Sequence, residues 1–213
     1  MSHLIALLRH GEVHNPGHVV YADLDGYALS DRGWAQAGAA ASHLADLGAV
    51  KIVTSPLQRA VETSNAVAAR VGRSPMVDPR LTEWMLSSRW AGTVWEDLPD
   101  QRPGELEAYL ADPTDLPFSP ESIARVADRM SAAIAEHSAP DRLTVFVSHQ
   151  DPVQSARIHL TSGSLSQLHQ NKPGHGSVIL LEQNPTGWTE RDYWEPDQGS
   201  SFPPVERSPR VSP

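Results

Sequence analysis

Two arginines and two histidines of this sequence stand where they could bind and attack a phosphoryl group: Arg9, His10, Arg59 and His149. They follow three short apolar segments, residues 4–8, 49–53 and 143–147. Arginine keeps its charge at ordinary pH and donates paired hydrogen bonds to phosphoryl oxygens. Cations beside a histidine disfavour its protonated form, which keeps the imidazole neutral and nucleophilic. These residue types therefore predict a site for a phosphoryl dianion with a histidine nucleophile.

The apolar segments before these residues are predicted to be buried parallel strands, each followed by a helix signal. The first helix is expected over about residues 32–47, between a cap at Ser30-Asp31 and Gly48. Further helix starts are expected at Ser55-Pro56, near Pro120 and at Asp151-Pro152. This alternation predicts an α/β fold, a three-layer α/β/α sandwich with a mostly parallel central sheet. Because ligands bind at the carboxyl ends of such strands, the arginines and histidines are expected to gather at one edge.

The remaining segments predict one catalytic domain over residues 1–194. Residues 177–183 and 188–194, separated by a turn sequence with proline and glycine, are expected to form a hairpin. Residues 84–118 are rich in Trp, Pro and Asp, and are interpreted as an insertion over the active-site edge of the sheet. Residues 195–213 are rich in proline and are expected to form a flexible tail.

Composition excludes several classes of function. Lys and Arg number 17 against 26 Asp and Glu, a net charge of −9, so a nucleic-acid partner is not expected. The chain has no cysteine, which excludes disulfides, thiolate metal sites and a cysteine nucleophile. No window is apolar enough for a membrane span, and the apolar run near the N-terminus is too short for a signal peptide. A cytoplasmic location is expected.

A series of motifs along residues 4–183 extends these observations. They are Leu8-Arg9-His10-Gly11-Glu12, Leu29-Ser30-Asp31-Arg32-Gly33, Ser55-Pro56-Leu57-Gln58-Arg59-Ala60, Leu81-Thr82-Glu83, Glu121-Ser122 and Val147-Ser148-His149. In this order and placement the motifs resemble those of the histidine phosphatase superfamily, which includes cofactor-dependent phosphoglycerate mutases and acid phosphatases. The resemblance implies a phosphoglycerate mutase-like fold and an enzyme that forms a phosphohistidine.

The resemblance also implies a role for each matching residue. His10 would attack phosphorus in line, while Arg9, Arg59 and His149 would hold the equatorial oxygens in the transition state. Glu83 would protonate the leaving alkoxide and then activate the water that cleaves the phosphohistidine. Neither a metal ion nor a cofactor is implied. The expected partner is a small phosphorylated metabolite, and a homodimer is left open.

Several positions depart from the family pattern. The asparagine that many members carry six residues after the nucleophile is replaced by Pro16, and Asn15 stands one residue earlier as the expected phosphate contact. The second histidine is followed by Gln150, which could donate its backbone N–H to phosphate, and by Asp151, interpreted as an N-cap. Residues 84–86 are large where small residues are usual, at the place of substrate groups beyond the phosphate.

Three functions are compatible with these residues: a phosphatase, a phosphoglycerate-type mutase, and a non-catalytic protein that binds a phosphorylated ligand. Mutases of the family tend to have a longer insertion rich in Lys and Arg. Residues 84–118 have only Arg89 and Arg102 as cations, which favours a phosphatase of small phosphate monoesters. The presence of both arginines, both histidines and a candidate acid disfavours a protein without catalysis.

Some residues keep alternative interpretations. Glu12 and Glu96 are rival acids to Glu83. A zinc site of His10, His14 and His18 is disfavoured, because Asn15-Pro16-Gly17 would break the helix that it needs. His169 and His175 are interpreted as surface residues. Trp84, Trp90 and Trp95 could either form an aromatic wall for a substrate or pack the insertion onto the sheet.

Overall fold

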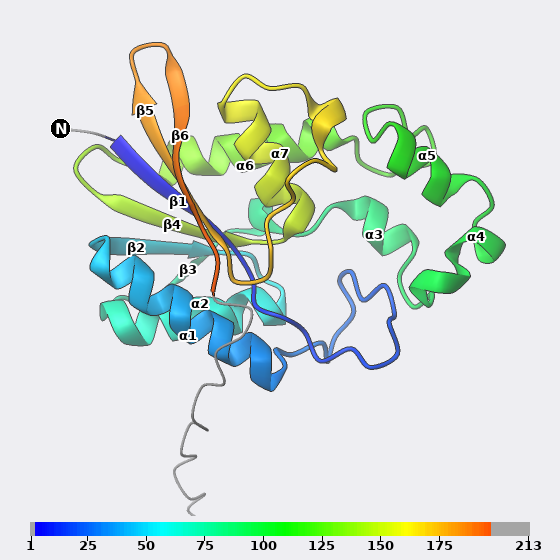
Figure 1. Cartoon of the computed structure of the whole chain (residues 1–213), viewed down its shortest axis with the longest axis horizontal. Coiled ribbons are helices and arrows are strands. Elements are labelled where there is room, and N and C mark those ends of the chain that lie inside the picture. Colours follow the sequence, from blue (N-terminus) through cyan, green and yellow to red (C-terminus); the bar gives the residue numbers. More distant parts are fainter. Residues whose placement is uncertain (1–2, 197–213) are drawn as a thin grey trace, which may run out of the picture.

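The centre of the computed structural model, which describes residues 3–196, is a six-stranded sheet with the order β3-β2-β4-β1-β5-β6 (Figure 1). The strands are β1 (His3–Arg9), β2 (Ala49–Thr54), β3 (Met76–Val77), β4 (Leu143–Ser148), β5 (Val178–Asn184) and β6 (Gly187–Trp194). The first four strands pair in parallel, and β5 and β6 add an antiparallel hairpin beside β1. The mostly parallel sheet and the hairpin predicted from the sequence are therefore confirmed; the short strand β3 had no sequence signal.

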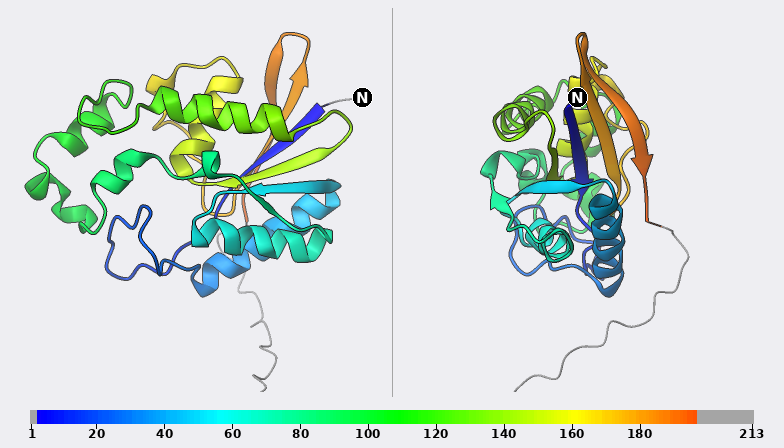
Figure 2. Two further views of the ribbon diagram at one scale, coloured as in Figure 1. Left: turned by 180° about the vertical axis from the view of Figure 1, so that it is seen from behind. Right: turned by 90° about the vertical axis from the view of Figure 1, so that its left-hand side faces the viewer.

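Helices cover both faces of the sheet, as Figure 2 shows from the side. The long helices are α1 (Asp31–Asp46), α2 (Gln58–Val71), α6 (Ile123–His137) and α7 (Gln150–Leu160). Alternate side chains of β1 separate the two cores, because successive residues of a strand point to opposite faces. Ala6 and Leu8 pack in the cluster that includes residues of α1 and α2, whereas Ile5 and Leu7 pack with residues of α6 and α7. The three-layer α/β/α prediction is confirmed.

Three of the predicted helix starts differ from the structure. Helix α2 begins at Gln58 instead of Pro56, after an extended Leu57 at the N-cap. The Ser55 hydroxyl accepts from the Leu57 N–H at 3.3 Å and contacts His149, but it does not cap the helix. Helix α7 begins at Gln150, so Asp151 lies inside the first turn and is not an N-cap. The helix expected near Pro120 begins at Ile123, after an N-cap at Ser122. Helix α1 begins as predicted, with the Ser30 hydroxyl accepting a hydrogen bond from the Gly33 N–H.

The segment 84–118 forms α3 (Met85–Arg89), α4 (Leu98–Gln101) and α5 (Glu105–Ala111) beyond the carboxyl ends of the strands (Figure 1). It has an apolar cluster of its own, in which Trp84, Trp90 and Tyr109 are buried. The segment also pairs with the loop that follows β1: the N–H of Val20 donates to the carbonyl of Thr93 at 2.8 Å, and Trp95 N–H to His18 O at 2.9 Å. The two excursions of the chain thus meet over the end of the sheet.

None of the helices between residues 3 and 196 has the length and apolarity that crossing a bilayer requires. The tail expected over residues 195–213 lies almost wholly outside the described residues, which end at Pro196.

Candidate active site

The two histidines lie side by side at the carboxyl ends of neighbouring strands. Arg9 at the end of β1 pairs in register with Ser148 at the end of β4, so the residues that follow, His10 and His149, are adjacent. Their ring centroids are 5.2 Å apart, and both side chains are buried. Placement at strand ends therefore brings these two predicted residues together.

His10 has a defined tautomer. One ring nitrogen, Nδ1, is 2.7 Å from the carbonyl oxygen of Gly11, which can only accept, so Nδ1 carries the proton. The other nitrogen, Nε2, accepts from the Arg59 Nε–H at 3.2 Å. Burial, and then the charges of Arg59, His149 and Arg9, hold the pKa of His10 well below its usual value. The ring is thus neutral, with an unprotonated Nε2 facing a guanidinium.

The loop that begins at His10 packs closely against the first turn of α1. A Cβ on Gly11 would lie 2.4 Å from the carbonyl oxygen of Gly33, and a Cβ on Gly33 would lie 2.0 Å from that of Glu12. Both contacts would be with backbone, which cannot move aside as a flexible side chain can. Glycine at both positions is therefore required by close packing of the two backbones.

Two arginines are fixed around the histidines. Arg59, fully buried, donates from Nη2 to the carbonyl of Ala22 at 2.8 Å and lies 4.7 Å from the ring centroid of Tyr21. Arg9 donates from Nη1 to Gln150 Oε1 at 2.9 Å and to the carbonyl of Pro173 at 2.8 Å. Both guanidiniums are therefore held in place by the protein before any ligand binds.

His149 uses one ring nitrogen within the protein. Its Nε2 is 2.7 Å from the hydroxyl of Ser55, while Nδ1 is buried without a hydrogen-bond partner among the described residues. Burial, followed by the charges of Arg59, Arg129 and Arg9, keeps its pKa well below the usual value. The ring of His149 is therefore neutral, with one nitrogen engaged by Ser55.

Glu83, the predicted acid, lines a cavity together with Arg9 and Arg59. Its Oε1 accepts from the N–H of Trp84 at 2.8 Å. Burial and the nearby Asp151 carboxylate raise its pKa to about 7, against the opposing effect of Arg59. The two rival acids are engaged elsewhere: Glu12 accepts from the Ser30 hydroxyl at 2.8 Å, and the exposed Glu96 is 3.1 Å from His18. Glu83 therefore carries a proton for a large part of the time near neutral pH.

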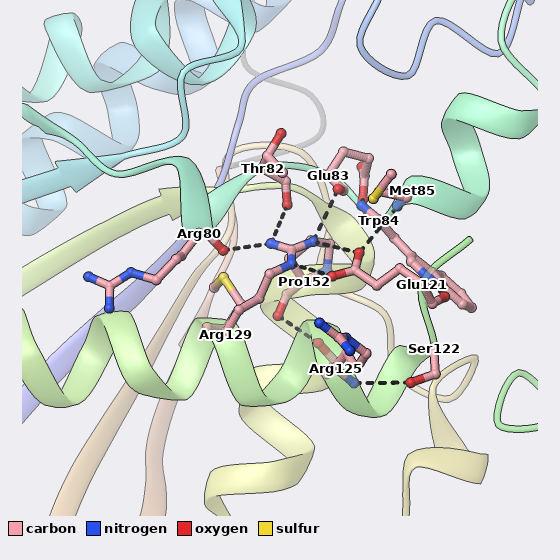
Figure 3. Close-up of polar contacts among 12 residues, drawn as sticks. Arg80, Thr82, Glu83, Trp84, Met85, Glu121, Ser122, Arg125, Arg129 and Pro152 are labelled. Atoms are coloured by element: carbon pink, nitrogen blue, oxygen red, sulfur yellow. Dashed lines mark hydrogen bonds and ion pairs between the residues drawn. The ribbon is translucent and has the colours of Figure 1, made fainter. Parts of the chain in front are cut away.

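An ion pair from helix α6 holds the backbone that presents Glu83 (Figure 3). The guanidinium of Arg129 donates to the carbonyl oxygens of Arg80, Thr82 and Glu83 and pairs with Glu121 at 2.8 Å. The side chains of Arg129 and Glu121 are only 16% and 11% exposed. Three carbonyls that no strand or helix would satisfy thus have a shared donor, which fixes the approach to Glu83.

Arg129→Met is expected to lower the free energy of unfolding by about 3–5 kcal/mol, because it leaves a buried carboxylate and several carbonyls without their partner. Urea denaturation followed by circular dichroism measures the change. The matched control is Arg73→Met at an exposed position, which should stay within about 0.5 kcal/mol of the parent. Similar values for the two variants would show that the ion pair does not hold this segment.

The remaining predicted residues lie near the site in different ways. Asn15 lines the cavity, but its amide is engaged with Val19, donating to its carbonyl at 2.9 Å and accepting from its N–H at 3.1 Å. Gln150 lines the cavity beside Arg9, and its N–H stands at the free start of helix α7. The interpretation of Asp151 as a cap is wrong: its Oδ2 accepts from the Tyr109 hydroxyl at 3.2 Å.

His175 was not expected at the site, and its interpretation as a surface residue is wrong. Its ring centroid is 5.6 Å from that of His10, and its Nε2 accepts from Arg9 Nη2 at 2.8 Å. Burial and then Arg9 lower its pKa to about 3. No motif marks His175, because it comes from the irregular stretch before β5; its contact with Arg9 depends on the fold.

The exposed His18, by contrast, pairs with Glu96 and stands apart from His10. Within residues 3–196, no three His, Asp or Glu side chains are grouped as metal ligands.

Above these residues is a cavity of about 530 Å³. Its floor includes Arg9, Arg59 and Glu83, and its walls come from the loop after β1 and from the segment 84–118. A cavity of this size accepts a small molecule. The strand ends therefore form the base of a pocket whose upper part is contributed by residues outside the sheet.

Comparison with known proteins agrees with this geometry. The family model of the histidine phosphatase superfamily (branch 1) matches residues 5–195. An uncharacterised protein of Mycobacterium tuberculosis is 37% identical over 171 residues, which cover 76% of this chain and 80% of that protein. Glucosyl-3-phosphoglycerate phosphatase of the same species is 31% identical over 210 residues, covering 93% of this chain and 88% of that protein.

A solved structure of the mycobacterial glucosyl-3-phosphoglycerate phosphatase, in complex with VO3, is 29% identical to this chain with a TM-score of 0.79. The match covers 92% of this chain and all (100%) of that one. The motifs at the strand ends, the family match over nearly the whole sheet and these relatives lead to one conclusion. The chain belongs to the histidine phosphatase superfamily.

Proposed function

We propose that this protein hydrolyses small phosphate monoesters through a phosphohistidine at His10. The observation that carries the proposal is the unprotonated Nε2 of His10, which lies 3.2 Å from the Nε–H of Arg59, a residue that lines a ligand-sized cavity. The relatives with an assigned activity are phosphatases, which supports the same reaction class. A screen of phosphorylated metabolites for phosphate release tests the proposal, and the absence of release from every compound, including p-nitrophenyl phosphate, would overturn it.

In the first step, the Nε2 lone pair of His10 forms a bond to phosphorus while the ester P–O bond breaks. The electron pair of that bond stays with the leaving oxygen, which takes the proton of Glu83. The hydrogen bond from Nδ1 to Gly11 O keeps Nε2 free of a proton and aims the ring. Arg9 and Arg59 stabilise the charge on the equatorial oxygens, and because they are fixed beforehand, little reorganisation is needed during the reaction.

In the second step, water attacks the phosphohistidine. Glu83, now a carboxylate, takes a proton from the water, the P–N bond breaks, and its electron pair returns to Nε2 of His10. A pKa of about 7 suits both roles of Glu83, since a group must hold its proton in one step and accept it in the next. The enzyme thereby returns to its starting protonation state.

His149 is proposed to donate from Nδ1 to a phosphoryl oxygen. The Ser55 hydroxyl beside Nε2 can donate to that nitrogen, which would place the proton of the neutral ring on Nδ1. For Gln150 the proposed contact is the backbone N–H at the start of α7. Asn15 would have to release Val19 to reach phosphate, so its contact is the least direct of those predicted.

The mutase alternative is less well supported. A mutase must hold a second phosphate or a carboxylate, and the segment 84–118 offers Arg89 and Arg102 as cations. Arg89 is already paired with Glu105 at 2.7 Å, and Arg102 donates to the carbonyl of Arg89 at 3.4 Å. A non-catalytic binding role is disfavoured by the presence of Glu83, which a passive phosphate site would not need.

Phosphate release is expected to be the same after exhaustive treatment with EDTA. Arg9 and Arg59 already supply the positive charge that a metal ion would bring to the phosphoryl oxygens. Initial rates with and without the chelator measure the effect. A large loss that zinc or magnesium restores would contradict the expectation.

A further inference from the structure

The upper part of the cavity is a connected aromatic wall. The ring centroids of Trp90 and Tyr109 are 5.5 Å apart, those of Trp84 and Tyr109 are 6.0 Å apart, and those of Trp90 and Trp95 are 6.4 Å apart. Trp84, Trp90 and Tyr109 are almost fully buried, so their positions are fixed, whereas Trp95 is 43% exposed. Trp95 therefore presents a partly exposed ring to the cavity, and its neighbour Trp90 is held in place by burial.

Beside the aromatic wall, the loop after β1 adds further apolar surface to the cavity. Val19, Val20 and Tyr21 line it, with the Tyr21 ring over the Arg59 guanidinium. Leu86 and Leu110 complete the lining on the side of the aromatic wall. A group that extends from the phosphate site along this cavity would therefore contact apolar surface from both segments.

The charges in the cavity disfavour a second anion on the ligand. Arg9 and Arg59 are the proposed phosphate ligands, and Lys172 is the other Lys or Arg among the described residues that line the cavity. Lys172 donates to the Tyr109 hydroxyl at 3.2 Å, and that hydroxyl donates to Asp151. The charge of Lys172 is therefore offset by a carboxylate, and its pKa is lowered, chiefly by burial.

Three carboxyl groups also line the cavity, those of Glu83, Glu96 and Asp151. Asp151 and Glu83 stand next to the phosphate site, and Glu96 stands at the mouth. A carboxylate or second phosphate on the ligand would meet Asp151 or Glu96 while Arg9 and Arg59 bind the first phosphate, and like charges at short range in a partly desolvated site repel strongly.

On the basis of the proposed phosphatase function, we propose that the substrate is a phosphate monoester whose alcohol carries an apolar, ring-containing group and no second anionic group. The ring would stack among Trp95, Trp90 and Tyr21, where burial of apolar area and contact between aromatic faces both contribute to binding. This substrate class differs from a phosphorylated sugar acid, whose carboxylate would face Asp151.

The test compares 2-phenylethyl phosphate with 3-phosphoglycerate. Both are esters of alkyl alcohols, so both need a proton from Glu83, and their comparison reports on the rest of the molecule. We expect kcat/KM for 2-phenylethyl phosphate to exceed that for 3-phosphoglycerate by at least ~10-fold, because one substrate gains apolar contact and the other suffers repulsion.

Variants at two positions assign the preference to residues. Trp95→Ala should reduce the ratio of the two kcat/KM values several-fold, mainly by raising KM for 2-phenylethyl phosphate, and Trp95→Phe should retain most of it. Asp151→Asn should also reduce the ratio, by raising kcat/KM for 3-phosphoglycerate. Any change in the acidity of Glu83 affects both substrates and cancels in the ratio. The control is Trp34→Ala on α1, which removes a tryptophan of similar exposure (44%) that does not line the cavity, and which should leave the ratio unchanged.

The outcomes separate the two proposals. Hydrolysis of p-nitrophenyl phosphate with a preference for 3-phosphoglycerate would overturn the substrate class and leave the phosphatase reaction standing. The same holds if Trp95→Ala and Asp151→Asn both keep the parent ratio. Absence of hydrolysis of all three esters would overturn the phosphatase proposal, and the substrate class with it.

Discussion

His10→Ala is expected to lower the rate of phosphate release at least ~10,000-fold, because removal of a covalent nucleophile leaves only the binding and electrostatic contributions of the site. Acid-labile, base-stable label from a radiolabelled monoester should be trapped on the parent protein and be absent from the variant. His149 is adjacent but has its Nε2 on Ser55 and its Nδ1 assigned to an oxygen of the phosphoryl group, so it cannot take over the attack.

The control for this variant is His14→Ala. His14 is exposed and does not line the cavity, so its loss should change neither the rate nor the labelling. Thermal unfolding of His10→Ala should remain cooperative, which separates a lost nucleophile from a lost fold. Label that persists on His10→Ala would place the covalent bond elsewhere.

Glu83→Gln is expected to slow hydrolysis of alkyl phosphates by roughly 100- to 10,000-fold, and that of p-nitrophenyl phosphate much less. An alkoxide is a poor leaving group without a proton, whereas nitrophenolate departs unaided. Some loss should remain with the nitrophenyl ester, because Glu83 also activates water in the second step. Steady-state kinetics on both esters measure the difference, and equal slowing of the two would show that Glu83 is not the acid.

The pH dependence of kcat/KM is an independent test of the role of Glu83. Burial and Asp151 raise the pKa of Glu83 to about 7, so the protonated form that the first step needs is present below pH 7 and lost above it. For an alkyl phosphate, kcat/KM should therefore decline as the pH rises through about 7. Asp151→Asn removes a cause of the raised pKa and should move this decline to lower pH; an unmoved decline would assign it to another group.

The positions of the residues proposed for catalysis at the strand ends could be predicted from the sequence, because two regular patterns define them. Apolar runs mark buried strands, and the carboxyl ends of parallel strands meet at one edge of the sheet. This brings Arg9, His10 and His149 together independently of the conformation of the loops. Arg59 follows from the helix after β2 in the same way. Glu83 follows no regular pattern, since it lies in an irregular stretch after β3, and only the family resemblance identified it.

The rest of the site depends on packing between segments that are distant in the sequence. Asp151 looked like a helix cap from its place before a proline, but the chain enters the helix one residue earlier and Tyr109 from the segment 84–118 takes the carboxylate. His175 and Lys172 reach the site from the stretch before β5, which has neither helical nor strand periodicity. Of the two roles left open for the tryptophans, Trp84 and Trp90 have that of buried packing, whereas for the exposed Trp95 the role of a wall for a substrate stays a prediction.

The pairing between the loop after β1 and the segment 84–118 bears on how such enzymes can diversify. Both walls of the substrate pocket belong to these two excursions, which are joined by backbone hydrogen bonds such as Val20 N–H to Thr93 O and Gly92 N–H to Val20 O. Arg9, His10, Arg59 and His149, which are proposed for the chemistry, lie outside this pairing, at the ends of strands and helices. A change of specificity by recombination would therefore have to exchange both excursions at once, although they are separate in the sequence.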